Sequence, residues 1–184
     1  MTACSGLFRG DHPAYLNDEK HGIYRYLMEQ KRNGRIKHLG FSCHGAMPVL
    51  ERFLAAYGKD MEFCQLQLNY LDWTFQNGRE KVALLNAWHI PVWVMEPLRG
   101  GKLASLAPAY EAELRALRPD EEIPAWTFRF LASIPSVTMI LSGMFNEAQL
   151  RKKPEDFRDG PLPAKKDLRG VETVFRRRFF PGTA

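Results

Sequence analysis

The sequence predicts an α/β fold in which parallel strands alternate with helices. Four short apolar runs begin near residues 36, 63, 90 and 137, and segments with helical spacing of apolar residues follow them. Strands that are almost continuously apolar are typical of parallel sheets covered by helices on both faces. The strand starts are 27 residues apart twice and then 47 residues apart. This spacing suits a βα barrel or a doubly wound sheet.

The composition of the 184-residue chain excludes several classes of protein. Hydrophobic residues make up 45% and charged residues 26%, so the chain is neither disordered nor fibrous. Three cysteines without a CxxC pair exclude a disulfide scaffold and a cysteine-based metal cluster. No apolar run approaches the ~20 residues of a membrane helix, and the N-terminus lacks the apolar core of a signal peptide. We therefore expect a cytoplasmic protein that has no metal site and does not contact a membrane.

The elements follow one another in a regular order. Asn17 and the two acids after it indicate the start of the first helix, and Gly34 indicates its end. Pro48 suits the first turn of the second helix. The predicted strands are 36–42, 63–68, 90–95 and 137–141. The other predicted helices are 48–57, 79–88, 103–117, 124–131, one beginning at 147, and 167–178.

Basic residues gather towards the C-terminal end. The formal net charge is +5, and residues 151–184 account for all of it with ten basic and five acidic side chains. A solvated basic face is the ordinary interpretation of such a segment. An anion site for a cofactor phosphate or for nucleic acid is the functional alternative. Only Phe175, Phe179 and Phe180 add aromatic rings to this segment, so nucleic acid is not the partner we expect.

Side chains with binding chemistry follow each predicted strand. Parallel α/β folds place their functional sites at the carboxyl ends of the strands. In this sequence those ends carry the segments 42–45, 65–72, 96–102 and 142–146. We therefore expect the site to be built from these four segments.

The four segments, in this order, resemble the second half of an aldo-keto reductase barrel. The resemblance is carried by GRIKHLGFS (34–42), FCQLQLNYLD (63–72), PVWVMEPLRGG (91–101) and LSGM (141–144), and it extends from about Leu16 to Phe157. It is closest to a bacterial branch that often carries a C-terminal ferredoxin-like segment, which does not follow here. The resemblance implies that the chain forms the second half of a TIM-type (β/α)8 barrel, truncated.

The resemblance also divides the chain and implies what it lacks. Residues 1–16 are unplaced, 17–160 form the half barrel, and 161–184 form a basic C-terminal helix and tail. The family's catalytic tyrosine, lysine, aspartate and histidine lie in the first half of the barrel, so we predict no catalytic residue here. Four strands leave open edges and an exposed apolar face. We expect a complementing N-terminal half or a homodimer, and an interrupted gene or a fragment would explain both ends.

The resemblance implies which residues would hold NADPH or NADH. Ser42 and Gln65 match the family residues that bind the nicotinamide carboxamide, and Cys43 stands where many members have asparagine. Met95 stands where an aromatic ring often stacks on the nicotinamide, and a thioether can pack on a ring face. The loop over the pyrophosphate matches Pro97, Leu98, Arg99, Gly100, Gly101 and Lys102. The segment near the adenosine 2′-phosphate matches Gly143, Met144 and Gln149.

Glycines and cations explain how such a loop would bind phosphate. Two adjacent glycines let the backbone approach phosphate closely, and Arg99 or Lys102 would supply positive charge. Lys152 and Lys153 stand where the family often has Glu-Asn, and they favour NADPH. The ordinary alternatives are a strand end for Ser42, a satisfied polar group at the barrel rim for Gln65, a core position for Met95, and a simple turn with solvated charges for the glycine loop. His44 matches no catalytic position.

The function implied by the resemblance is NADPH-dependent reduction of an aldehyde or ketone. This chain would supply most of the cofactor half-site of that oxidoreductase, without its catalytic residues. The alternative is a non-catalytic half barrel that binds a nucleotide or another protein.

Overall fold

A five-stranded parallel sheet organises the computed structural model, which describes residues 2–5 and 21–151. The strands lie side by side in sequence order, each paired in parallel with the next. This order is that of successive βα units, and it confirms the predicted α/β class. The strands are β1 (Thr2–Ser5), β2 (His38–Cys43), β3 (Phe63–Gln67), β4 (Val92–Met95) and β5 (Val137–Ile140).

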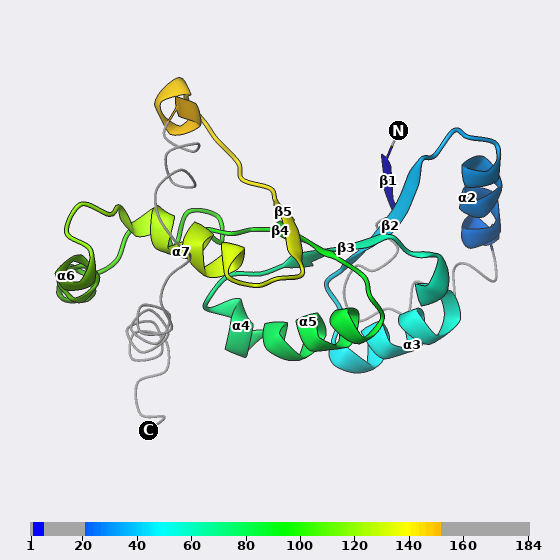
Figure 1. Ribbon diagram of the computed structural model, residues 1–184, viewed down its shortest axis with the longest axis horizontal. Helices are drawn as coiled ribbons and strands as arrows, with labels where there is room; N and C mark the ends of the chain where they lie inside the picture. The colour runs from blue at the N-terminus through cyan, green and yellow to red at the C-terminus, as the bar shows by residue number, and fades with distance from the viewer. Residues whose placement is uncertain (1, 6–20, 152–184) are drawn as a thin grey trace.

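Helices connect the strands and cover one face of the sheet. In Figure 1, α3, α4 and α5 run along one side of the strands, while α6 and α7 lie together at the end where α4 begins. Prolines occupy the first turn of α3, α6 and α7, where a missing N–H costs no hydrogen bond. The helices are α2 (Ile23–Arg32), α3 (Met47–Tyr57), α4 (Asp72–Phe75), α5 (Gly78–Ala87), α6 (Pro108–Leu117) and α7 (Ile123–Ala132), with a 3-10 turn η1 (Gly58–Asp60).

Several elements differ from the prediction, and α4 and η1 were not predicted. The sheet has one strand more than expected, because β1 pairs with β2 in a segment that the sequence left unplaced. The helix predicted over 103–117 begins only at Pro108, because the residues before it form a turn. Helix α2 begins at Ile23, after Gly22 adopts a left-handed conformation with φ 62°. The predicted start at Asn17, residues 152 and 153, and the predicted helix over 167–178 lie outside the described residues.

The two faces of the sheet have different roles. Alternate side chains of a strand point to opposite faces. Leu39 and Phe41 of β2 are fully buried and belong to the main core, together with side chains of α3 and α5. The opposite face carries Gly40 and Ser42 of β2, Phe63, Gln65 and Gln67 of β3, and Trp93 and Met95 of β4. This second face leads to the candidate site.

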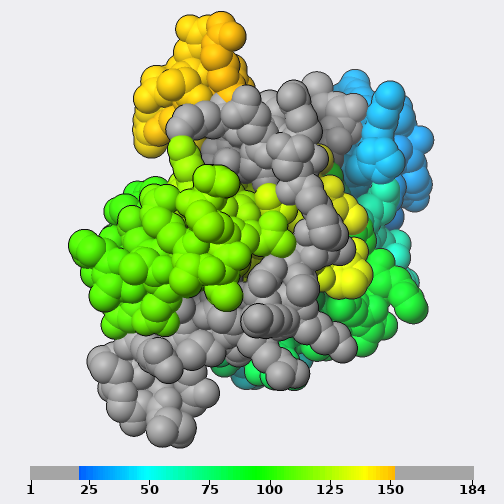
Figure 2. Space-filling model, turned by 60° about the vertical axis from the view of Figure 1, so that its left-hand side comes forward, coloured from blue at the N-terminus to red at the C-terminus, as the bar shows by residue number. Residues whose placement is uncertain are grey.

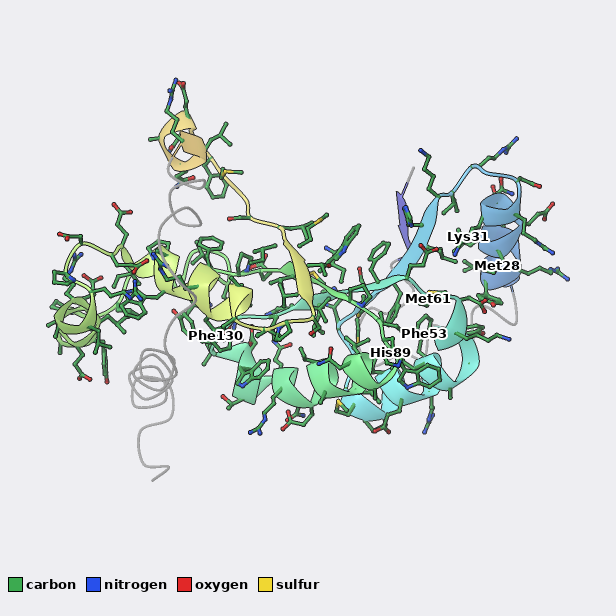
Figure 3. The ribbon with its side chains drawn as sticks, in the orientation of Figure 1. Met28, Lys31, Phe53, Met61, His89 and Phe130 are labelled. Atoms are coloured by element: carbon green, nitrogen blue, oxygen red, sulfur yellow. The ribbon has the colours of Figure 1, made fainter. Side chains whose placement is uncertain are left out.

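A second core lies around α6 and α7. Its buried members include Leu103, Leu114 and Trp126, with Tyr70 and Leu71 from the segment after β3. Phe130 of α7 packs against both cores (Figure 3). Its ring meets Trp73 edge-on, with the ring centroids 5.6 Å apart. The second core therefore fixes the segments that follow β3 and β4 relative to the sheet.

Helix α2 attaches at the other end of the sheet. Met28 packs against the main core, which includes Met61 and Phe53 (Figure 3). Lys31 donates a hydrogen bond to Glu62, just before β3. At the end of α5, His89 adopts a left-handed conformation with φ 57°. Among the described residues, every helix is too short or too polar to cross a bilayer.

Candidate functional site

A cavity of about 540 Å³ lies where the segments after β4 and β5 meet. This volume is in the range of small-molecule sites, about 300–1,000 Å³. Figure 2 shows the side of the molecule on which α6, α7 and the segment after β5 gather. The cavity is at the carboxyl ends of parallel strands, where the sequence predicted a site. Its lining consists of Met95, Glu96, Pro97, Leu98, Gly100, Gly101 and Ala104 after β4, Pro124 of α7, and Leu141, Ser142, Gly143, Phe145 and Gln149 after β5.

The cavity brings together two groups of predicted residues that are distant in the sequence. The predicted residues that line it are Met95, Pro97, Leu98, Gly100, Gly101, Gly143 and Gln149. Arg99, Lys102 and Met144 belong to the same two segments without lining the cavity. The residues that the prediction missed are Glu96, Ala104, Pro124, Leu141, Ser142 and Phe145. Glu96, Ser142 and Phe145 lie within the strand-end segments 96–102 and 142–146, so position in the sequence was a signal for all three.

The segment after β4 is a tight turn with unusual backbone angles. Four of its residues are left-handed: Glu96 (φ 56°), Arg99 (φ 49°), Gly100 (φ 62°) and Gly101 (φ 87°). The Arg99 N–H donates to the Glu96 carbonyl at 3.0 Å, which closes the turn. A Cβ at Gly101 would meet no heavy atom within 4 Å. Gly100 and Gly101 line the cavity, so their backbone is accessible to an oxygen-rich ligand.

The segment after β5 is held by side-chain caps. Asn146 Oδ1 accepts a hydrogen bond from the Gln149 N–H at 2.9 Å, which caps the helical turn that begins at Glu147. Gln149 Oε1 in turn accepts from the Phe145 N–H at 2.8 Å. A Cβ at Gly143 would also meet open space. This second wall therefore combines an open glycine with a glutamine held in place by its neighbours.

A row of side chains connects the cavity with the open face of the sheet. Ser42 and Gln65 are register partners in β2 and β3. Gln65 Nε2 lies 3.8 Å from Met95 Sδ, a hydrogen-bonding distance for sulfur. Met95 lines the cavity, whereas Ser42 and Gln65 do not. Gln65 is thus connected to the cavity through Met95, and Ser42 lies one strand further from it.

Cys43 points into the main core. Its side chain is 2% exposed, and its Sγ lies 4.0 Å from the Gly45 carbonyl. Burial raises the pKa of the Cys43 thiol, and the opposing effects of the Lys81 charge and the Gly45 carbonyl are smaller. The thiol is therefore protonated at neutral pH and is a packing residue in this structure.

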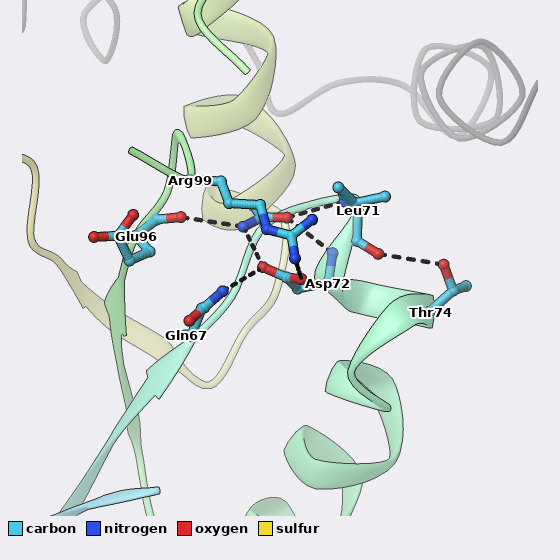
Figure 4. A network of polar contacts seen from close by, with 7 residues as sticks. Gln67, Leu71, Asp72, Thr74, Glu96 and Arg99 are labelled. Carbon is cyan, nitrogen blue, oxygen red and sulfur yellow. Dashed lines mark hydrogen bonds and ion pairs between the residues drawn. The ribbon is translucent and has the colours of Figure 1, made fainter. Parts of the chain in front are cut away.

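A buried polar network joins β3 to the turn after β4 (Figure 4). Asp72 is fully buried and accepts hydrogen bonds from Gln67 Nε2 at 2.9 Å and Asn69 Nδ2 at 2.7 Å. Asn69 is also fully buried, and it donates to the Glu96 carbonyl at 3.1 Å. Arg99 Nη2 lies 3.7 Å from Asp72 Oδ1. The network therefore contacts the glycine turn at two points.

The lining suits a ligand with both a flat apolar part and an oxygen-rich part. Met95, Pro97 and Leu141 provide apolar surface, and the glycines provide accessible backbone. Among the described residues that line the cavity, Glu96 alone has a charged side chain. In the part of the chain that the structure describes, no group of three or more potential metal-ligating side chains comes together. The cavity therefore offers apolar surface, accessible backbone and one carboxylate to an organic ligand.

Solved structures with similar folds are aldo-keto reductases. The apo form of one from Bacillus halodurans has a TM-score of 0.70 at 18% identity, over 93% of this chain and 60% of that chain. One from a Medee basin deep-sea metagenome library, MGS-M4, has a TM-score of 0.68 at 15% identity, over 93% and 57%. One from Brucella melitensis has a TM-score of 0.63 at 18% identity, over 83% and 53%.

Sequence comparisons add no closer relative. No protein-family model matches the sequence, and no curated protein matches it. The chain spans about half to three fifths of the solved structures to which it is similar. At these identities the likeness establishes the fold. The chain therefore has the architecture of part of an aldo-keto reductase, in agreement with a truncated (β/α) barrel.

Proposed function

We propose that this chain is the cofactor-binding half of an aldo-keto reductase and takes part in the NADPH-dependent reduction of an aldehyde or ketone. The observation that carries the proposal is the cavity between the segments after β4 and β5. These are the two segments whose sequences resemble the cofactor loops of the family. The fold and the position of the cavity at the strand ends support the same proposal.

The residues of the cavity fit a nicotinamide dinucleotide. The open backbone at Gly101 and Gly143 suits a pyrophosphate, which requires close approach of N–H groups. Met95 offers a thioether and apolar surface to a flat ring. Gln65, which contacts Met95, would orient the carboxamide together with Ser42. A nicotinamide supplies the hydride when bound, and the role of these residues is to bind and orient it.

The preference for NADPH rests on positive charge near the phosphates. Lys102 follows the glycine turn, while Lys152 and Lys153 lie outside the described residues. Arg99 is engaged by Asp72, so we assign the positive charge near the phosphates to Lys102, which follows the turn without lining the cavity. The carboxylate of Glu96 opposes an anion in the same cavity. We therefore propose NADPH over NADH, with Glu96 weakening the binding of either.

Reduction of a carbonyl requires residues that this sequence does not match. We propose that they come from a complementing half barrel, because the chain spans only part of the structures it resembles. Met139 and Leu141, on and just after β5, are 44% and 39% exposed. This apolar edge suits burial against another chain. A cytoplasmic location remains a prediction from the free thiols.

A non-catalytic nucleotide-binding module is the alternative function. It is favoured by one observation: the glycine-lined cavity lies entirely within the described residues of this chain. The alternative predicts dinucleotide binding but no aldehyde reduction with any complementing half. The basic segment 161–184 lies outside the described residues, so a nucleic-acid role gains no support from the structure.

The proposal is tested by titrating NADPH and NADH into the full chain and following its tryptophan fluorescence, to which Trp93, the register partner of Gln65, contributes. We expect saturable binding in the micromolar range that Gly101→Val weakens. Gly34→Val is the matched control, because both glycines have left-handed φ angles (87° and 73°) and open space around the missing Cβ. Gly34 lies between α2 and β2, far from the cavity segments in sequence. Absence of binding, or equal losses in both variants, would overturn the proposal.

A further inference from the structure

We propose that Asp72, Asn69 and Arg99 act together as positioning residues that hold the glycine turn 96–101 in its ligand-ready form. Arg99 in this arrangement supports the turn and is not a ligand of phosphate. The inference rests on the proposed function only for the identity of the ligand. The sequence-based expectation is that Arg99 or Lys102 supplies positive charge to the pyrophosphate, and this inference leaves that role to Lys102.

The charge of Arg99 is directed inwards. Asp72 is 0% exposed, and a buried carboxylate is costly unless its oxygens find donors. Its Oδ2 accepts the amides of Gln67 and Asn69. Its Oδ1 has no hydrogen-bond donor in the part of the chain that the structure describes, and Arg99 Nη2 lies 3.7 Å from it. Arg99 is thus the cation that compensates this oxygen.

A second contact fixes the direction of the Arg99 side chain. Its Cζ atom lies 5.2 Å from the centroid of the Phe75 ring, which follows Asp72 by one helical turn. A guanidinium at this distance from a ring face is attracted by the ring. Arg99 is therefore held between the carboxylate and the ring, and it does not line the cavity.

Asn69 fixes the other end of the turn. Its Nδ2 donates to the Glu96 carbonyl at 3.1 Å, while its Oδ1 accepts the Asp72 N–H at 2.8 Å. Glu96, the first residue of the turn, is therefore connected through Asn69 to Asp72, where α4 begins. Arg99, near the end of the turn, is connected to the same residue. Figure 4 shows both connections converging on Asp72.

The turn needs this support because of its backbone. Glu96 and Arg99 are left-handed without being glycine, and such conformations persist only where the surroundings hold them. Gly100 and Gly101 alone are free to adopt many other conformations. Support at both ends therefore keeps Gly100 and Gly101, which line the cavity, in one backbone conformation before any ligand arrives, which lowers the cost of binding.

The experiment compares Arg99→Met, Asp72→Asn and the double variant with the wild-type chain. Hydrogen exchange of the amides at 102–104 is measured without ligand, since the Lys102 and Ala104 N–H groups donate to carbonyls within the turn. NADPH affinity is measured separately. We expect each single variant to speed exchange and to weaken NADPH binding about tenfold, as for loss of a charged hydrogen bond. The double variant should bind no more weakly than either single one.

The sign of the Asp72→Asn effect distinguishes the two roles of Arg99. If Arg99 were a phosphate ligand, Asp72→Asn would free its charge and tighten NADPH binding. Lys102→Met is the charge-matched control and should weaken binding without changing exchange. Tighter binding by Asp72→Asn, or unchanged exchange in Arg99→Met, would overturn the inference. If the Asp72→Asn variant does not fold, hydrogen exchange of the amides at 102–104 in the Arg99→Met variant tests the inference by itself.

The inference and the proposed function fail separately. If the wild-type chain binds neither NADPH nor NADH, the proposed function fails. The exchange experiment needs no ligand, so it still tests whether Asp72 and Arg99 hold the turn. If NADPH binds and the variants leave exchange unchanged, the positioning role fails and the proposed function stands.

Discussion

The ring of Phe63 lies against Gly40 of the neighbouring strand, where a Cβ would be 2.5 Å from the nearest ring carbon. The two residues are register partners in β2 and β3. On its other side the ring stacks on Trp93, with centroids 3.8 Å apart and the planes inclined by 13°. The ring is therefore confined between two strands, and only glycine fits at position 40.

Gly40→Ala is expected to destabilise the fold by about 1–3 kcal/mol, because the new methyl group overlaps a ring that cannot move away. Urea unfolding followed by tryptophan fluorescence measures the change. Gly143→Ala is the control, since a Cβ there meets nothing within 4 Å, and its effect should stay within about 0.5 kcal/mol. Equal stabilities of the two variants would show that Phe63 does not confine position 40.

Glu62 makes stability depend on pH. Partial burial raises its pKa, but the hydrogen bonds and charges of Lys31 and His38 outweigh burial and lower the pKa below its usual value. The folded state thus favours the carboxylate. Its contribution is present above the unfolded pKa of about 4.3 and is lost as the pH falls through the lower folded pKa.

Glu62→Gln should therefore cost about 0.5–1 kcal/mol at pH 7, the range of a largely exposed ion pair. The difference from the wild-type chain should shrink once the pH falls below about 4. Urea unfolding at a series of pH values measures it, with the exposed Glu51→Gln of α3 as control. A difference that stays constant from pH 7 to pH 3 would contradict the role of the carboxylate charge.

Glu96 places a negative charge in a cavity proposed to hold phosphates. Glu96→Gln is expected to tighten NADPH binding by about two- to fivefold at low salt, because the like-charge repulsion is removed. The gain should fall as ionic strength screens the interaction. Glu80→Gln, at an exposed position of α5, serves as the control. Weaker binding by Glu96→Gln at every salt concentration would mean that the carboxylate contacts the ligand favourably.

The exposed apolar edge at β5 predicts association. Met139 is 44% exposed on this strand, and an apolar edge favours pairing with another chain. Sedimentation of the full chain over a range of concentrations should show self-association that Met139→Lys reduces. Leu117→Lys on α6, where the side chain is 36% exposed, should not reduce it. If the chain were monomeric at every concentration, this would contradict self-association. The edge of β5 would then have to pair with a different chain that supplies the complementing half barrel.

Much of the fold follows from local patterns. The runs over 63–68 and 90–95 predicted β3 and β4 to within two residues, because buried parallel strands are almost continuously apolar. The start of α6 was misplaced because Leu103 and Leu106 have helical spacing but are buried in the second core around a turn. Strand β1 has only four residues and no apolar pattern, so its place depends on pairing with β2.

The site was predictable where it follows a strand directly. Met95 ends the apolar run 90–95 and Gly101 lies in the segment 96–102 that follows it, so their positions indicated the cavity. Pro124 reaches the lining through the packing of α7, which no local pattern reveals. The inward direction of Arg99 depends on Asp72, a buried carboxylate in a different βα unit. Sequence spacing predicts which segments meet, whereas the partner of a long charged side chain is decided by three-dimensional packing.

Hydrogen exchange of the full chain with and without NADPH tests the central claim most directly, because it locates the ligand. The account predicts slower exchange in residues 95–104 and 141–150, the two segments that line the cavity, and no change in α3. Protection confined to other segments, or none at saturating NADPH, would contradict a dinucleotide site between β4 and β5.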